Sequence, residues 1–275
     1  MSLSKRISIA ENTCRRNFST QKIRSNSSGI HCRHIHWLVL VHIAMNRAAA
    51  AMSTQKKGAL IFLHGLGDTP AGWSSLEQTL PSMRPKLQDI AYVFPPAPTI
   101  PISINGGMAM PGWFDLYDWP IAVGSQDDPE GLQRSVSMVQ NEVKKLNEQG
   151  IPSSKIVVGG FSQGGAVSLL YCYQQKEQSF AGCAALSAWL TLPDQLAVSA
   201  KAKSTPLFWG HGRMDDKVLF DQQAFGIAKL EEQGIKVDGK AYNMGHSSHP
   251  QEMEDLADFL EECLFSDGAE SASEL

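Results

Sequence analysis

A five-residue motif in the middle of the chain has the composition of a nucleophile elbow. Residues 160–164 read Gly-Phe-Ser-Gln-Gly, so Ser162 occupies the serine of the pattern G-x-S-x-G. Residues 155–159 before it, which read Lys-Ile-Val-Val-Gly, are typical of a short buried strand, and residues 165–173 after it favour a helix. Glycines are needed at such a sharp strand-to-helix turn because side chains would collide there, and a helix start directs N–H groups toward developing negative charge. We therefore interpret Ser162 as a nucleophile rather than as part of a turn without chemistry.

Two neighbouring carboxylates follow another apolar segment. Residues 205–210 predict a buried strand, and the polar loop after it contains Asp215 and Asp216. In enzymes with a nucleophile elbow the acid follows the serine along the chain, and the histidine follows the acid. Spacing alone does not separate the two carboxylates, one of which would be an ordinary solvated loop residue.

The histidine is expected in the loop after the last predicted strand, residues 236–242. This loop contains His246 and His249. We favour His246 because a glycine precedes it, whereas His249 is followed by a proline that is a plausible helix start. His64 and His211 also lie at predicted strand ends, where a lone histidine is more often structural than catalytic.

These loops should meet at one edge of the molecule, because ligands of open parallel sheets bind outside the carboxyl ends of the strands. The proposed triad is then Ser162, Asp215 and His246. Ser162 would attack an acyl carbon, and His246 would take the serine proton and pass it to the leaving group. The acid would hold the imidazole tautomer and stabilise the imidazolium.

A glycine-rich loop near the start of the domain is the candidate for an oxyanion hole. Residues 57–63 predict an early apolar strand, and residues 64–68 after it read His-Gly-Leu-Gly-Asp. One N–H donor should be the amide of Gln163, just after the nucleophile, and the other the amide of Leu66. A phosphate-binding P-loop is excluded, because its lysine and hydroxyl residue are missing.

Six motifs, in this order along the chain, resemble the acyl-protein thioesterase and lysophospholipase family of small carboxylesterases. They are His-Gly-Leu-Gly-Asp at 64–68, Phe-Pro-Pro-Ala-Pro at 94–98, Pro-Gly-Trp-Phe-Asp at 111–115, Gly-Phe-Ser-Gln-Gly-Gly at 160–165, Gly-His-Gly at 210–212 and Met-Gly-His-Ser-Ser at 244–248. The resemblance covers about residues 56–265. It implies an α/β-hydrolase fold, with a mostly parallel central sheet flanked by helices and no large cap domain.

The resemblance also implies roles for individual residues. It assigns Ser162 as nucleophile, His246 as base, and Leu66 with Gln163 as oxyanion donors. It favours Asp215 over Asp216, because the family's acid is the third residue after the His-Gly pair. The chain departs from the family just after this acid, where relatives have Pro-Leu and this sequence has Asp216-Lys217. We expect this charge beside the acyl channel to disfavour long acyl chains.

Substrate contacts are expected from the long segment between the second predicted strand, residues 90–94, and the first long helix. About thirty residues without regular periodicity carry many apolar side chains, and loops of this length in a compact domain are usually functional. We interpret them as an adaptable wall for an acyl chain, the alternative being that they only cover the edge of the sheet. The predicted substrate-binding residues are Met108, Met110, Trp113, Phe114 and Lys217. Trp113 is also expected to be a packing anchor, and Asp115 to brace the loop.

Charge and composition together divide the chain into three parts. Residues 1–53 contain eight Lys/Arg and one Glu, a balance of +7, whereas residues 54–275 contain sixteen Lys/Arg and twenty-seven Asp/Glu, a balance of −11. The first segment is basic and serine-rich, and we interpret it as a targeting segment or as an upstream extension outside the fold. Residues 54–265 are long enough for one domain with a large core. The polar, acidic residues 266–275 predict a disordered tail.

The helix pattern within the domain fits alternating strands and helices. Asp128-Pro129 predicts a capped helix start, and apolar residues at spacings of four and three follow it as far as Gly150. Further helices are predicted over residues 220–233 and 250–264. Helix bundles and β-sandwiches do not fit this order of elements.

Together these features predict a serine hydrolase that cleaves thioester or carboxylic ester bonds of acylated substrates through an acyl-enzyme. The alternative is a hydrolase-fold binding protein with negligible turnover. No cofactor or metal is expected, since histidines and cysteines lack zinc-site spacing. Expected partners are an acylated protein, a lysophospholipid or a small acyl ester, with transient membrane-surface contact, no nucleic acid, and a monomer or weak homodimer. Five cysteines at unpatterned spacings favour a reducing compartment, the cytoplasm, or an organelle (plastid or mitochondrion) if residues 1–53 are a transit peptide.

Overall fold

The computed structural model describes residues 56–174 and 178–266 of the chain. The predicted N-terminal segment, residues 1–53, lies outside the described residues, as does the predicted tail apart from its first residue. The described residues belong to a single compact unit that begins at Lys56.

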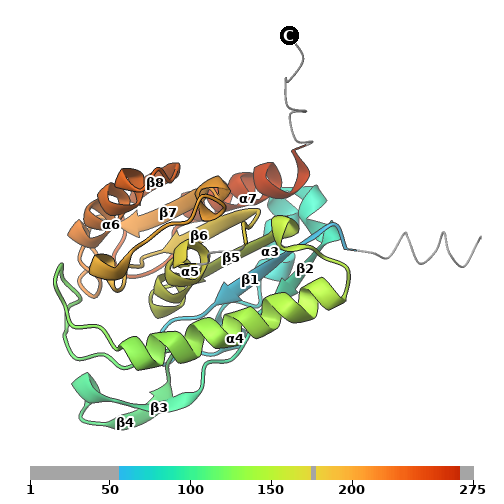
Figure 1. The fold of residues 1–275 in the computed structure, drawn as a ribbon. Coiled ribbons are helices and arrows are strands. Elements are labelled where there is room, and N and C mark those ends of the chain that lie inside the picture. The colour runs from blue at the N-terminus through green and yellow to red at the C-terminus, as the bar shows by residue number, and fades with distance from the viewer. Residues whose placement is uncertain (1–55, 175–177, 267–275) are drawn as a thin grey trace, which may run out of the picture. The chain divides into compact units, whose positions relative to one another are not determined.

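A six-stranded sheet forms the centre of this unit, and all of its neighbouring strands are parallel (Figure 1). The strand order is β2-β1-β5-β6-β7-β8. The strands are β1 (Gly58–Leu63), β2 (Ile90–Val93), β5 (Ile156–Phe161), β6 (Gly182–Leu186), β7 (Leu207–Gly212) and β8 (Val237–Tyr242). The central strands are apolar on both faces, because in a parallel sheet of this kind helices cover both sides. In β1, for example, Ile61 and Leu63 enter one apolar core while Leu60 and Phe62 enter the other.

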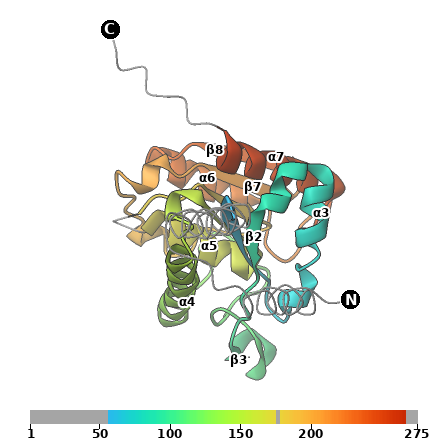
Figure 2. The ribbon, with the colours of Figure 1, turned by 90° about the vertical axis from the view of Figure 1, so that its right-hand side faces the viewer.

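Helices cover both faces of the sheet, so this unit has three layers (Figures 1 and 2). One face packs against α4 (Pro129–Glu148), α5 (Gln163–Gln174) and α6 (Asp221–Glu232), and the other against α3 (Leu76–Met83) and α7 (Pro250–Phe265). Short 3-10 turns complete the connections: Pro70–Gly72, Pro85–Asp89, Ser103–Asn105, Ser153–Lys155, Pro193–Gln195 and Ala202–Ser204. The predicted α/β-hydrolase architecture is confirmed, and the described residues contain no large cap domain.

Helix α4 begins and ends where the sequence predicts. The Asp128 side chain accepts a hydrogen bond from the Gly131 amide (2.9 Å), and Pro129 is the first helical residue, so the helix start is capped. The chain leaves the helix through Gly150, whose φ of 88° lies in the left-handed region that favours glycine. The buried face of α4 consists of Leu132, Val139, Val143 and Leu146, with neighbouring small residues.

The segment between β2 and α4 has more regular structure than the sequence predicts. Strands β3 (Thr99–Ile102) and β4 (Met108–Pro111) pair as an antiparallel hairpin. Its turn closes through Gly106 and Gly107, both with positive φ (67° and 78°). The expectation of an irregular loop was wrong, because four-residue strands that contain prolines show too little alternation to be recognised. Asp115 does brace this region, since its carboxylate accepts from the amide (2.6 Å) and hydroxyl (2.5 Å) of Ser103.

None of the helices described within residues 56–174 and 178–266 is both long enough and apolar enough to cross a membrane.

Candidate active site

Ser162 stands at the sharp turn between β5 and α5. Its backbone is in the left-handed region (φ 54°), and its amide donates to the carbonyl of Leu186 at the end of β6 (2.9 Å). A Cβ atom at Gly160 would overlap the backbone of Gly164, and one at Gly164 would overlap the carbonyl of Leu63. Both glycines of the motif are therefore required by close backbone approach, and strain at the serine is held in place by the sheet around it.

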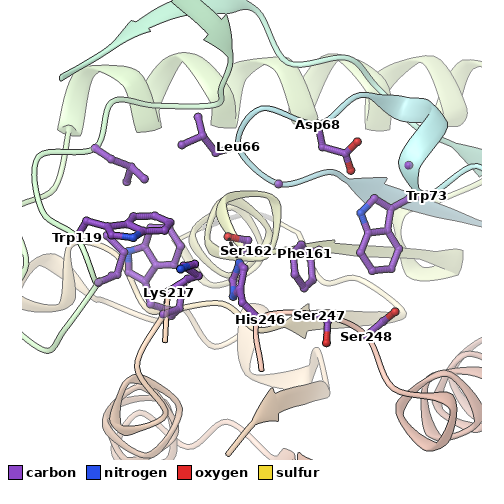
Figure 3. A pocket seen from close by; sticks show the side chains of 16 residues that line it. Leu66, Asp68, Trp73, Trp119, Phe161, Ser162, Lys217, His246, Ser247 and Ser248 are labelled. Atoms are coloured by element: carbon purple, nitrogen blue, oxygen red, sulfur yellow. Dashed lines mark hydrogen bonds between the residues drawn. The ribbon is translucent and has the colours of Figure 1, made fainter. Parts of the chain in front are cut away.

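The structure brings Ser162, His246 and Asp215 into one chain of hydrogen bonds. His246 Nε2 lies 3.0 Å from Ser162 Oγ, and His246 Nδ1 lies 2.7 Å from Asp215 Oδ2. A carboxylate only accepts, so Nδ1 carries the proton and Nε2 is free to accept the serine hydroxyl proton. The imidazole also packs against the ring of Phe161, with centroids 4.8 Å apart (Figure 3).

Asp215 is buried and held from two sides. Its Oδ1 accepts from the amides of Lys217 and Val218, both at 2.9 Å, while Oδ2 faces His246. Burial acts to raise the pKa of the Asp215 carboxyl, but the hydrogen bond and charge of His246 and the two amides outweigh it, and the net pKa is lowered. The carboxylate is thus ionised at neutral pH and oriented toward the imidazole.

The competing acid and histidine residues lie elsewhere. Asp216 is exposed and pairs with the Lys217 ammonium (3.1 Å). His249 caps α7, with its Nδ1 accepting from the Gln251 amide (3.1 Å). His64 is buried, and its Nε2 accepts from the amide of Ala97 (3.1 Å).

The 64–68 loop lies against the nucleophile elbow. A Cβ atom at Gly65 would be 3.4 Å from the Cβ of Ser162, and Leu66 lines the same cavity as the serine. The Gly67 amide is engaged by the carbonyl of Pro111 (2.7 Å). By contrast, the hydrogen bonds found among the described residues include none from the amides of Leu66 or Gln163. Both amides are therefore available to a ligand.

A buried bracing network, not foreseen in the sequence, ties this loop to the elbow. The Gln163 side chain accepts from the Trp113 amide (3.0 Å) and donates to the carbonyl of Phe114 (2.7 Å). The Trp113 indole in turn donates to the carbonyl of His64 (2.7 Å). The side chain of the residue after the nucleophile thus binds the segment that holds the glycine-rich loop. The sequence offers one signal for this network: the segments that contain His64, Trp113 and Gln163 are all among the family motifs. The motifs do not show that these segments are in contact.

A cavity of about 460 Å³ surrounds Ser162 and His246. Its apolar wall is formed by Leu66, Trp73, Leu116, Trp119, Ile121, Phe161, Trp189 and Val218, and its polar groups include Asp68, Lys217, Ser247 and Ser248. In Figure 3, Trp119 and Lys217 lie on one side of Ser162, and Trp73 and Asp68 on the other. The cavity therefore extends in two directions from the serine.

Of the five predicted substrate-binding residues, only Lys217 lines this cavity. Its ammonium lies 5.8 Å from the centre of the Trp119 ring. Trp113 and Phe114 are instead 1% exposed and belong to the core, so assigning them to the cavity wall was wrong. Met108 and Met110 lie on the hairpin, outside the cavity lining, and Met108 is 63% exposed. Apolar composition identified the segment but could not show which side chains the core would absorb.

Several wall residues were not named as candidates in the sequence analysis, although Trp119 and Ile121 lie in the long segment between β2 and α4 that it did single out. Trp73 follows the glycine-rich loop, Trp119 precedes a proline in the loop before α4, and Trp189 follows β6. Ile121 and Val218 form a parallel bridge that joins two wall segments far apart in the sequence. Aromatic composition in loops at the carboxyl ends of strands was the only available signal.

Within the described residues, no cluster of three or more His, Cys, Asp or Glu side chains could hold a metal ion. The chemistry that this geometry supports is nucleophilic attack by an activated serine next to two free N–H donors.

Comparison with known proteins places the chain in a family. Residues 45–264 match the phospholipase/carboxylesterase family, and the chain belongs to it. It is accordingly a serine hydrolase, of a class that acts on acyl ester and thioester bonds.

Individual relatives agree with this placement. The chain is 40% identical over 222 residues to acyl-protein thioesterase 1 of Cryptococcus neoformans, covering 74% of this chain and 92% of the relative. It is 35% identical over 232 residues to the Saccharomyces cerevisiae protein of the same name, covering 80% and 98%. Among solved structures it is similar to Zea mays acyl-protein thioesterase 2 (TM-score 0.67, 31% identity, 76% and 95% covered) and Arabidopsis thaliana SOBER1 (TM-score 0.70, 29%, 75% and 99%).

Proposed function

We propose that Ser162, His246 and Asp215 are the catalytic triad of this hydrolase. The observation that carries the proposal is the continuous hydrogen-bonded chain from Ser162 Oγ through both imidazole nitrogens to a buried carboxylate. Ser162 Oγ attacks the acyl carbon while His246 Nε2 takes its proton, and the imidazolium then protonates the leaving group. Water, deprotonated by the same nitrogen, releases the acyl group from the serine.

The amides of Leu66 and Gln163 are proposed as the oxyanion hole. Neither amide donates a hydrogen bond within the part of the chain that the structure describes, and both lie beside Ser162, which supports this role. Such donors act because they are already oriented when negative charge develops on the carbonyl oxygen, and each is typically worth about 3 kcal/mol of the barrier.

The proposed substrates are acylated proteins, lysophospholipids or small acyl esters. Relatives with the name acyl-protein thioesterase support the first class. We propose that the acyl chain enters the side of the cavity that carries Trp119 and Lys217 and that the leaving group occupies the side with Trp73. Transient membrane contact and a monomeric or weakly dimeric state are part of this proposal.

The test is a substrate series. Rates on p-nitrophenyl esters of two to sixteen carbons, a palmitoyl thioester and a lysophospholipid should show turnover that Ser162→Ala lowers by about four orders of magnitude or more, with an unchanged melting temperature. A fluorophosphonate probe should label the parent and leave the Ser162→Ala variant unlabelled. Labelling of that variant, or full activity in it, would refute the nucleophile assignment.

We propose the cytoplasm as the site of action, with a plastid or mitochondrion as the alternative if residues 1–53 act as a transit peptide. Fluorescent fusions with and without residues 1–53 distinguish the two: identical diffuse distributions support the cytoplasm, and organellar signal only with the segment supports the alternative.

A further inference from the structure

A second histidine lies beside the acid and has no part in the mechanism above. His211 is the next-to-last residue of β7, and its side chain is fully buried. Its Nε2 lies 2.9 Å from the carbonyl oxygen of Val218 and 3.4 Å from Asp215 Oδ2. That carboxylate oxygen is the one that accepts from His246.

The surroundings of His211 select a single protonation state. A carbonyl oxygen only accepts, so Nε2 must carry the hydrogen. Nδ1 is buried and has no hydrogen-bond partner among the described residues. Burial lowers the pKa of His211, more than the Val218 carbonyl and the Asp215 charge raise it, and the charge of His246 lowers it further. His211 is thus a neutral imidazole with its one N–H directed at the turn that carries the acid.

This N–H closes the turn formed by residues 215–218. Within the turn, the amides of Lys217 and Val218 donate to one oxygen of Asp215. From strand β7, His211 donates to the carbonyl of Val218 and so links the turn to the sheet. The same imidazole edge stands next to the other oxygen of Asp215. Without the His211 N–H, the Val218 carbonyl would lose its partner among the described residues, and Asp215 Oδ2 would lose a neighbouring positive dipole.

We propose that His211 is a positioning residue that keeps Asp215 Oδ2 directed at His246. The proposal rests on the role proposed above for Asp215. The charged or titratable groups around the ring are Asp215 and His246, while Arg213 lies over the Phe220 ring that packs against His211. A neutral donor suits this role, because a charged His211 would compete with His246 for the carboxylate.

The experiment compares His211→Gln with His211→Asn. The Gln amide nitrogen reaches about as far as Nε2, whereas the shorter Asn amide cannot reach the Val218 carbonyl; both are polar. For His211→Asn we expect kcat to fall about tenfold or more with KM within about twofold of the parent. The acid limb of the kcat/KM profile should move to lower pH, because a misaligned Asp215 carboxylate stabilises the protonated base less. His211→Gln should restore both quantities toward the parent.

His249→Gln is the matched control, since this histidine caps α7 and does not touch the acid; its acid limb should coincide with that of the parent. The melting temperature of each variant is measured as well, and it distinguishes a loss of folding from a loss of positioning. If His211→Asn keeps the parent's acid limb and loses activity only in proportion to its folded fraction, the role of His211 is structural and the proposal fails. Failure of the triad itself would appear differently, as turnover that survives in Ser162→Ala.

Discussion

Asp215 and Asp216 are neighbours in the chain but have opposite environments. Asp215 is 5% exposed and accepts three hydrogen bonds, whereas Asp216 is exposed and pairs with a lysine ammonium. An exposed pair of this kind contributes little to stability, about 0–1 kcal/mol. The two carboxylates should therefore respond very differently to substitution.

Asp215→Asn should reduce kcat by about three orders of magnitude or more, since the amide neither stabilises the imidazolium nor holds the correct tautomer. Its effect should be strongly non-additive with Ser162→Ala if, as proposed, the three residues act as a unit. Asp216→Asn should stay within about tenfold of the parent, equivalent to about 1.4 kcal/mol of barrier. Steady-state kinetics on one nitrophenyl ester measure all variants, and a larger loss at Asp216 would reverse the assignment.

Lys217 should set the acyl chain-length preference. Its stem lines the cavity while its ammonium stays near water, over Trp119, so deep burial of an acyl chain there is disfavoured. Short and medium esters should outperform sixteen-carbon ones in the parent. Lys217→Leu should shift the optimum to longer chains, since each further buried CH₂ is worth about 0.8 kcal/mol. Asp216→Asn is the control, because it removes the ion-pair partner of Lys217 but leaves the ammonium in place. Identical chain-length profiles for the parent and Lys217→Leu would exclude a role of Lys217 in chain-length preference.

At the scale of elements, the loop after β1 and the elbow after β5 depend on each other through the segment after β4. Gln163 binds the backbone of that segment, and Trp113 binds the backbone of His64. The oxyanion donors proposed at Leu66 and Gln163 therefore have a common support. This gives the buried Trp113 a function even though it does not touch the cavity.

Trp113→Phe should test this support. The change leaves the His64 carbonyl without its indole partner, at a cost of about 1–3 kcal/mol in unfolding free energy, and frees the loop that carries Leu66. We expect kcat to fall about tenfold with little change in KM. Trp209→Phe is the matched control, because Trp209 is fully buried but its indole N–H has no partner among the described residues. Equal losses of kcat in the two variants would contradict a specific role for Trp113.

For the whole molecule, Glu252 links stability to pH. This carboxyl is fully buried in the first turn of α7, beside Gly210, and neither oxygen has a hydrogen-bond partner of normal geometry among the described residues. Burial raises the pKa of Glu252 from 4.5 to about 8, although a hydrogen bond with the backbone of His249 acts in the opposite direction. The folded protein therefore keeps this proton in a pH range where the unfolded chain loses it.

Unfolding free energy should consequently fall as the pH rises from about 4.5 to about 8, by up to about 1.4 kcal/mol per pH unit from this group. Glu252→Gln, which stays neutral, should remove this contribution and become the more stable protein at the alkaline end. Urea unfolding across the range measures the difference, with the exposed Glu148→Gln as control. A constant difference between parent and Glu252→Gln would show that the carboxyl is not protonated in the folded state.

The sequence by itself determined most of the local elements around the site and their order, but not the β3–β4 hairpin. The elbow glycines, the Asp128 cap and the apolar central strands are dictated by sterics and hydrogen bonding between near neighbours in the chain. The parallel sheet then follows from the alternation of strands and helices, and it brings the loops bearing Ser162, Asp215 and His246 to one edge.

Only the tertiary structure decided which side chains those loops direct at one another. It turned Asp215 rather than Asp216 toward His246, placed His211 beside that acid, and assembled the cavity wall from segments far apart in the sequence. It also moved Trp113 and Phe114 from the expected wall into the core. The physical reason is that side-chain direction and burial depend on the packing of distant segments, about which composition and local periodicity carry no information.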